Sequence, residues 1–134
     1  EPPPPYRQEE VTILNGPIVL AGTLTAPATP GAHPAVVLIT GSGPQNRDEE
    51  VFGVKPFRMI ADHLTRAGIA VLRCDDRGVG GSTGSVPKST TADFAEDVLA
   101  QARYREGRPD REPRNSPKRR SCFSCTERRL WIKM

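Results

Sequence analysis

One short segment, Ala35-Val36-Val37-Leu38-Ile39, constrains the fold more than any other part of the sequence. All five residues are apolar, three of them are β-branched, and no polar residue alternates with them. Such a run is typical of a strand that is buried on both faces of a parallel sheet, because helices cover each face of such a sheet. The segment therefore predicts an α/β fold.

An antiparallel hairpin is expected before this strand. Residues 11–14 and 18–25 each predict a strand, and Asn15-Gly16-Pro17 between them favours a turn. A loop rich in proline, glycine and alanine then leads to the buried strand.

A βαβ unit is expected after it. Residues 56–68 predict a helix with Pro56 in its first turn and Gly68 ending it in the left-handed conformation. Residues 69–72 predict a second buried strand. The order of strand, helix and strand with short joints predicts a parallel pair.

A second helix is expected from Thr91 to about residue 106, with Thr91 as its N-cap. The residues expected to line its buried face are Phe94, Val98, Leu99 and Ala102. After Gly107 the apolar periodicity ends. Together these patterns predict a partial sheet of α/β class that stops before any further buried strand.

Composition divides the 134 residues into three parts. Residues 1–9 predict a proline-rich linker, residues 10–107 the α/β portion, and residues 108–134 a basic tail that is irregular, disordered or non-native. The net charge of +3 averages an acidic body and a basic end, because residues 103–134 hold 11 of the 19 Lys and Arg residues. No apolar stretch is long enough to span a bilayer.

The first candidate site is Gly41-Ser42-Gly43, directly after the buried strand. Ligands in open α/β sheets bind at the carboxyl ends of the strands. Small residues there allow backbone N–H groups to converge on an anion, and the N–H of Ser42 or Gly43 is placed to stabilise a developing oxyanion. A simple glycine turn leaving the strand is an equally good interpretation.

The second candidate is Ser82, because Gly80-Gly81-Ser82-Thr83-Gly84 matches the Gly-x-Ser-x-Gly pattern of hydrolase nucleophiles. That chemistry needs the serine on a sharp turn directly between a strand and a helix. Here the strand ends near Arg73 and seven loop residues, Cys74 to Gly80, intervene, and the next helix begins only near Thr91. We therefore expect Ser82 to have a structural role, in a tight loop where Asp75 or Asp76 pairs with Arg77.

Other reactive residues are expected to be structural, and no metal or cofactor is expected. Asp75 and Asp76 offer too few oxygen ligands for a hard cation. The pair Cys122 and Cys125 has the spacing of a metal knuckle or redox pair, but no second pair of ligands lies nearby. His33 and His63 are expected at the surface.

Taken together, these motifs resemble a known family. Residues 34–49, from Pro34 through Gly41-Ser42-Gly43-Pro44 to Glu49, are similar to the first sheet strand and oxyanion loop of bacterial α/β-hydrolases. Those proteins are described as esterases, serine aminopeptidases or dienelactone-hydrolase-like proteins. Residues 57–64, 68–82 and 91–97 resemble them in the same order. The resemblance covers roughly residues 10–110.

The resemblance implies a serine-hydrolase-type protein that transfers an acyl group from a carboxylic ester or small amide to water. It places Ser42 as the contributor of an oxyanion-hole N–H, with Gly41 and Gly43 beside the substrate. In the family a buried strand and a Gly-x-Ser-x-Gly nucleophile follow the helix equivalent to residues 91–106. This sequence departs there, so we expect an inactive fragment without nucleophile, acid and base.

An alternative is a non-catalytic binding module whose basic tail engages anionic partners. Lys118-Arg119-Arg120 and Arg128-Arg129 are suited to phosphates, and Phe123 and Trp131 to stacking on bases. No nucleic-acid-binding motif accompanies them, so a specific nucleic-acid partner is not expected.

Overall fold

A mixed sheet forms the centre of the computed structural model, which describes residues 2–41, 43–108 and 130–133. The elements in chain order are β1 Tyr6–Asn15, β2 Ile18–Pro27, β3 Ala35–Ile39, α1 Pro56–Arg66, β4 Ala70–Cys74, a short 3₁₀ helix Val86–Lys88, α2 Thr91–Glu106 and β5 Leu130–Lys133. The strand order in the sheet is β1-β2-β4-β3-β5.

The predicted hairpin is present and longer than expected. β1 and β2 pair antiparallel from Asn15 and Ile18 at the turn to Tyr6 and Pro27 at the far end. Gly16 takes a φ of 57° in the turn, where a side chain would be strained. β1 begins at Tyr6, inside the segment predicted as a linker, because β2 offers partners along its whole length.

The βαβ unit is confirmed. β3 runs parallel to β4 with Val36 opposite Val71, and α1 connects the two strands. Pro56 occupies the first turn of α1, and Gly68 follows the helix with a φ of 93°, as its sequence position predicts.

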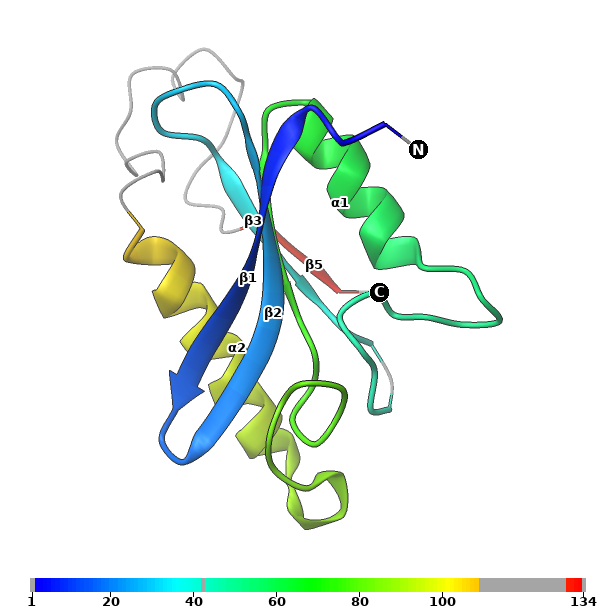
Figure 1. The fold of residues 1–134 in the computed structure, drawn as a ribbon. Helices are drawn as coiled ribbons and strands as arrows, with labels where there is room; N and C mark the ends of the chain where they lie inside the picture. Colours follow the sequence, from blue (N-terminus) through cyan, green and yellow to red (C-terminus); the bar gives the residue numbers. More distant parts are fainter. Residues whose placement is uncertain (1, 42, 109–129, 134) are drawn as a thin grey trace.

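Both faces of the sheet are covered, which is why its central strands β3 and β4 are apolar except for Arg73. Val36, Leu38 and Val71 pack with Phe57 and other α1 residues on one face. The alternate residues of the same strands pack with the hairpin and α2 on the other face. Figure 1 shows the two helices on opposite sides of the sheet.

Helix α2 departs from its prediction in two ways. Thr90, not Thr91, is the N-cap: its hydroxyl accepts from the Asp93 N–H, and the Asp93 carboxylate accepts from the Thr90 N–H. The expected apolar face is confirmed only in part: Ala102 is buried and Phe94 and Val98 are half-buried, but Leu99 is exposed. The residues of α2 that are buried are Asp97, Gln101, Ala102 and Arg105. Within the described residues, neither helix is long and apolar enough to cross a membrane.

Strand β5 was not expected from the sequence. Residues 130–133 fall in the predicted irregular tail, yet they run parallel to β3, with Lys133 opposite Ile39. The rest of the tail, residues 109–129, lies outside the described residues, and so do Cys122 and Cys125.

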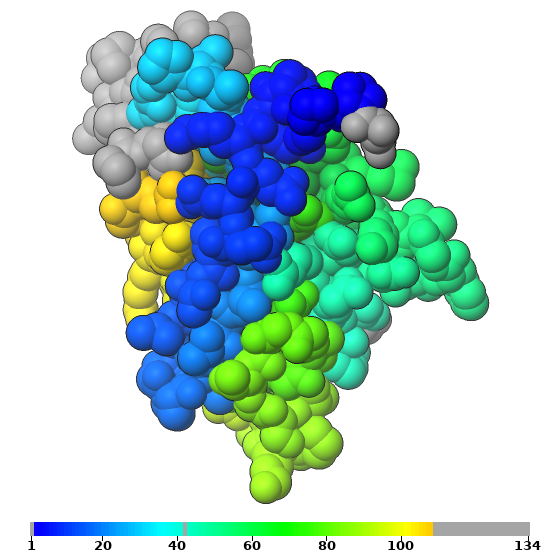
Figure 2. Space-filling view, in the orientation of Figure 1, coloured from blue at the N-terminus to red at the C-terminus, as the bar shows by residue number. Residues whose placement is uncertain are grey.

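Elsewhere, a turn over residues 51–54 projects from the body of the molecule (Figure 2).

Candidate functional site at the ends of β3 and β4

Two loops meet at the carboxyl ends of the central parallel strands. The β3 loop comprises residues 40–49, and the β4 loop comprises residues 75–85. Because β3 and β4 are parallel neighbours, both loops leave the same edge of the sheet. The sequence prediction placed the site at this edge.

Asp76 of the β4 loop fastens two points of the β3 loop. Its carboxylate accepts hydrogen bonds from the Thr40 hydroxyl at 2.8 and 2.9 Å and from the Gln45 N–H at 3.0 Å. The Asp76 N–H in turn donates to the Gln45 carbonyl at 3.1 Å. Thr40 and Gln45 flank the candidate segment 41–44, so one aspartate fixes where this segment begins and ends.

The environment of Asp76 disfavours its charge. Burial raises the pKa of its carboxyl, and the hydrogen bonds from Gln45 and Thr40 offset this only in part. The nearby Asp97 and Asp75 carboxylates raise the pKa further.

The predicted oxyanion segment is only partly described. The Gly41 N–H donates to Glu49 Oε1 at 3.3 Å, and Gly43 is exposed with a φ of 73°. Ser42 lies outside the described residues, so its role remains a prediction. The described geometry is that of a glycine segment with one amide held against a carboxylate.

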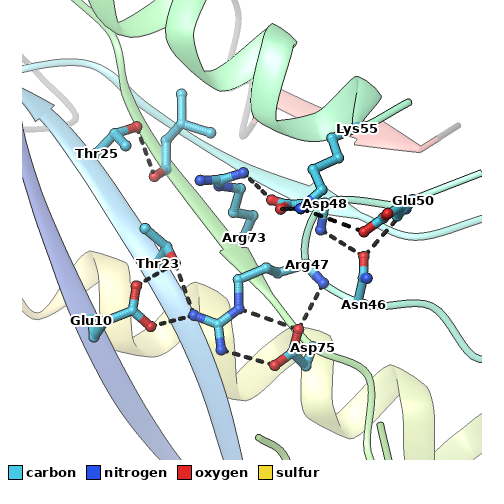
Figure 3. Close-up of polar contacts among 11 residues, drawn as sticks. Glu10, Thr23, Thr25, Asn46, Arg47, Asp48, Glu50, Lys55, Arg73 and Asp75 are labelled. Carbon is cyan, nitrogen blue, oxygen red and sulfur yellow. Dashed lines mark hydrogen bonds and ion pairs between the residues drawn. The ribbon is translucent and has the colours of Figure 1, made fainter. Parts of the chain in front are cut away.

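Arg47 joins the β3 loop to the β4 loop and to the hairpin (Figure 3). Its guanidinium donates to both Asp75 oxygens, at 3.2 and 2.8 Å, and to the Thr23 hydroxyl at 2.8 Å, and it also pairs with Glu10. The Asp75 bond is the main reason why the pKa of Arg47 is raised. Burial by itself raises the pKa of Asp75. The hydrogen bonds from Arg47 and Gly81 outweigh burial, so the pKa of Asp75 is lowered.

A second ion pair lies on the α1 face of the sheet. Arg73 is buried near the carboxyl end of β4, and it pairs with Asp48 of the β3 loop (Figure 3). Burial lowers the pKa of Arg73. The sequence did not predict these pairs. A charged residue inside a buried strand was the available signal, because a buried arginine needs a carboxylate partner.

The predicted partner of Arg77 was wrong. Neither Asp75 nor Asp76 pairs with it; its guanidinium donates to both oxygens of Asp97 on α2, each at 2.7 Å. This bond raises the pKa of Arg77. Asp97 is in addition bonded by the Asn15 side chain. Sequence spacing could not identify Asp97, because the two residues are brought together by tertiary packing.

Ser82 has the structural role expected of it. The residue is buried, its hydroxyl donates to the Asp75 carbonyl at 2.8 Å, and it accepts from the Ala21 N–H at 3.0 Å. Both functions of the hydroxyl are therefore used to attach the β4 loop to β2.

The other reactive side chains differ in their surroundings. His33 is buried, contrary to prediction, because its Nε2 bonds the Thr29 carbonyl at 2.8 Å within its own loop. His63 is exposed, as predicted. Cys74 is buried, and burial raises the pKa of its thiol to about 12, which disfavours a reactive thiolate. Among the described residues, no cluster of His, Cys, Asp and Glu has the geometry to hold a metal ion.

Comparison with known proteins agrees with this architecture. No protein-family model matches the chain. Esterase EstD from Thermotoga maritima is 33% identical over 108 residues, which cover 81% of this chain and 25% of that protein. The solved structure of Est1E from Butyrivibrio proteoclasticus with bound ferulic acid matches with a TM-score of 0.66 and 24% identity, over 76% of this chain and 39% of the other. The chain carries part of an α/β-hydrolase fold.

A further esterase structure has a similar fold. An esterase from Pyrococcus furiosus matches with a TM-score of 0.61 and 20% identity, over 79% of this chain and 37% of the other. The chain thus spans about a quarter of the curated relative that it matches and under two fifths of these solved hydrolases. Likeness at this identity establishes the fold, and it leaves the reaction to be argued from the site.

Proposed function

We propose that this chain is the oxyanion-binding part of a serine-hydrolase-type protein that acts on carboxylic esters or small amides. The observation that carries the proposal is the glycine segment at the carboxyl end of β3, fastened at both ends by Asp76. Similarity to esterase EstD supports an ester as the substrate class. No cofactor enters this proposal.

The chemistry assigned to the segment is electrostatic. When a nucleophile attacks an ester carbonyl, the carbonyl oxygen gains negative charge. Preorganised N–H groups then stabilise it by about 3 kcal/mol for one donor. We assign that role to the N–H of Ser42, with Gly41 and Gly43 lining the substrate. Fixed loop ends matter here, because donors that need no reorientation at the moment of reaction are the effective ones.

Residues 1–134 are proposed to lack the covalent machinery. The one Gly-x-Ser-x-Gly pattern has Ser82 at its centre, and the Ser82 hydroxyl already bonds the Asp75 carbonyl and the Ala21 N–H. Neither described histidine lies beside this serine: His33 bonds Thr29 in its own loop, and His63 is on α1. We therefore assign the chain no acyl-enzyme step and no turnover of its own.

The test is hydrolysis of nitrophenyl acetate by the purified chain, with Ser82→Ala as the control. We expect rates at the buffer background for both proteins, and no serine labelled by a fluorophosphonate reagent. Turnover that disappears in Ser82→Ala would show that Ser82 is a nucleophile after all. Turnover that persists in Ser82→Ala would place an unrecognised nucleophile elsewhere in the chain.

The alternative of a binding module with a basic tail has no structural observation in its favour. Most of the tail, residues 109–129, lies outside the described residues, as do the side chains of β5. The binding-module alternative predicts that the chain binds RNA or acidic lipid, that this binding weakens steeply with salt, and that it is lost when residues 108–134 are removed.

A further inference from the structure

Glu49 lies at the far end of the β3 loop, but its side chain returns to the beginning of that loop. Its Oε1 accepts the hydrogen bond of the Gly41 N–H at 3.3 Å. We propose that Glu49 is an internal anion that occupies the Gly41 amide and competes there with an incoming carboxylate or oxyanion. This inference rests on the proposed function, because it concerns the regulation of the same site.

The chemical match between the two occupants is close. A carboxylate oxygen and a tetrahedral oxyanion both carry negative charge and accept hydrogen bonds from backbone N–H groups. An amide that holds a carboxylate in the free protein is therefore oriented for an anionic ligand. The Gly41 amide is already hydrogen-bonded to Glu49, so a ligand must displace the Glu49 side chain before the ligand can accept that hydrogen bond.

A turn built around Asn46 fixes the position of Glu49. The Asn46 carbonyl accepts from the Glu49 N–H at 3.0 Å, and the Asn46 side chain accepts from the N–H groups of Asp48 and Glu50 at 3.1 and 3.2 Å. Glu49 itself has a φ of 49°, a conformation that residues other than glycine seldom adopt. Strain of this kind is typical of functional sites.

The neighbouring carboxylates behave differently. Asp48 pairs with Arg73, and Glu50 lies 3.5 Å from the Lys55 ammonium group. Both are thus held by cations, whereas the described contact of Glu49 is to a backbone amide. At 3.3 Å that bond is long for a charge-assisted hydrogen bond, so the contact is suited to being displaced.

Backbone amide NMR of the full chain tests the inference, with acetate as the probe at constant ionic strength. If Glu49 occupies the amide nine tenths of the time, it weakens apparent acetate binding by about tenfold. We expect the Gly41 amide to respond to acetate several-fold more tightly in Glu49→Ala than in the wild type. Glu49→Gln keeps an oxygen without the charge, and its affinity should fall between the two.

Glu50→Ala is the matched control, because it removes the same charge one residue away and leaves the Gly41 contact intact. Its acetate affinity should equal that of the wild type. Equal affinity in all the proteins, or an equal gain in Glu49→Ala and Glu50→Ala, would overturn the role of Glu49 while leaving the anion site in place. If the Gly41 and Gly43 amides respond to acetate in none of them, both the anion site and its internal competitor are wrong.

Discussion

The β3 loop and the β4 loop are both rich in glycine and leave the same edge of the sheet, but they use their glycines differently. In the β4 loop, a Cβ on Gly80 would lie 2.6 Å from Asp75 Oδ2, and one on Gly81 would lie 2.9 Å from the Ala21 Cβ. In the β3 loop, a Cβ on Gly43 would meet no heavy atom within 4 Å. One loop is filled by its own atoms, and the other leaves space beside its backbone.

This difference explains why a nucleophile motif can mislead. The β4 loop contains the serine pattern, yet the Ser82 hydroxyl and the Gly81 N–H are hydrogen-bonded within the loop and to β2, so this serine is committed to structure. The β3 loop contains no such motif. Its glycine backbone is open at Gly43 and faces an anion at Gly41. Space and free hydrogen-bonding capacity, more than residue type, separate a binding loop from a structural one.

The largest effect is expected from Asp75→Ala, which would break the filled loop. The side chain of Asp75 is 5% exposed and pairs with Arg47. Removing one partner of a buried pair leaves the other uncompensated and typically costs 3–5 kcal/mol, so we expect a loss of about 3 kcal/mol in the free energy of unfolding, since Arg47 keeps Glu10. Urea denaturation measures this loss.

The control for that variant is Glu50→Ala, directly after the β3 loop, which removes an exposed pair with Lys55. A loss below about 1 kcal/mol is expected there. Equal losses in the two variants would show that Asp75 does not organise the β4 loop.

Alanine at Gly80 and at Gly43 compares the two loops directly. Both glycines have positive φ, 53° and 73°, so each substitution carries the conformational cost of about 1–2 kcal/mol. Gly80→Ala adds the clash with Asp75, and we expect it to cost at least about 1 kcal/mol more than Gly43→Ala. Thermal unfolding of both variants gives the difference. Similar losses would mean that the β4 loop relaxes and is not tightly packed.

The pKa values of the adjacent Asp75 and Asp76 should be shifted in opposite directions. Asp75 has a lowered pKa, so the stability that it contributes is present above about pH 4 and is lost as the pH falls through its folded value. Asp76 has a raised pKa, so its contribution is present below about pH 4 and is lost as the pH rises through its folded value. NMR titration of the two carboxyl carbons should give midpoints on either side of that pH. Coinciding midpoints would contradict the two environments.

The sequence predicted the central sheet well, because hydrophobic periodicity reports burial directly. β3 was predicted with its observed bounds, and the first residue of α1 was correct because Pro56 favours a helix start. The partners of Arg47, Arg73 and Arg77 could not be predicted, since each pair joins residues at least 20 positions apart. Asp97 on the buried face of α2 was missed for the same reason, because its partner Arg77 comes from the β4 loop.

The smallest expected effect on stability concerns the turn over residues 51–54. Its backbone has positive φ but is not packed against other parts of the chain, as at Gly43. Phe52 and Gly53 have φ values of 51° and 79°, and Val51 and Val54 exchange two backbone hydrogen bonds of 3.0 Å around them. Two central residues of positive φ define a type I′ turn, which favours Asn-Gly. Phe52 is fully exposed, so replacing it removes no buried contact.

Phe52→Asn should therefore stabilise the chain by up to about 1 kcal/mol, because asparagine tolerates the left-handed conformation better than phenylalanine. Phe52→Ala is the matched control: it removes the same ring but keeps the strained φ, and it should leave stability nearly unchanged. Urea denaturation of both variants separates the backbone effect from the loss of the ring. If Phe52→Asn is no more stable than Phe52→Ala, positive φ alone costs little in this chain. The cost measured for Gly80→Ala would then be due to its clash with Asp75.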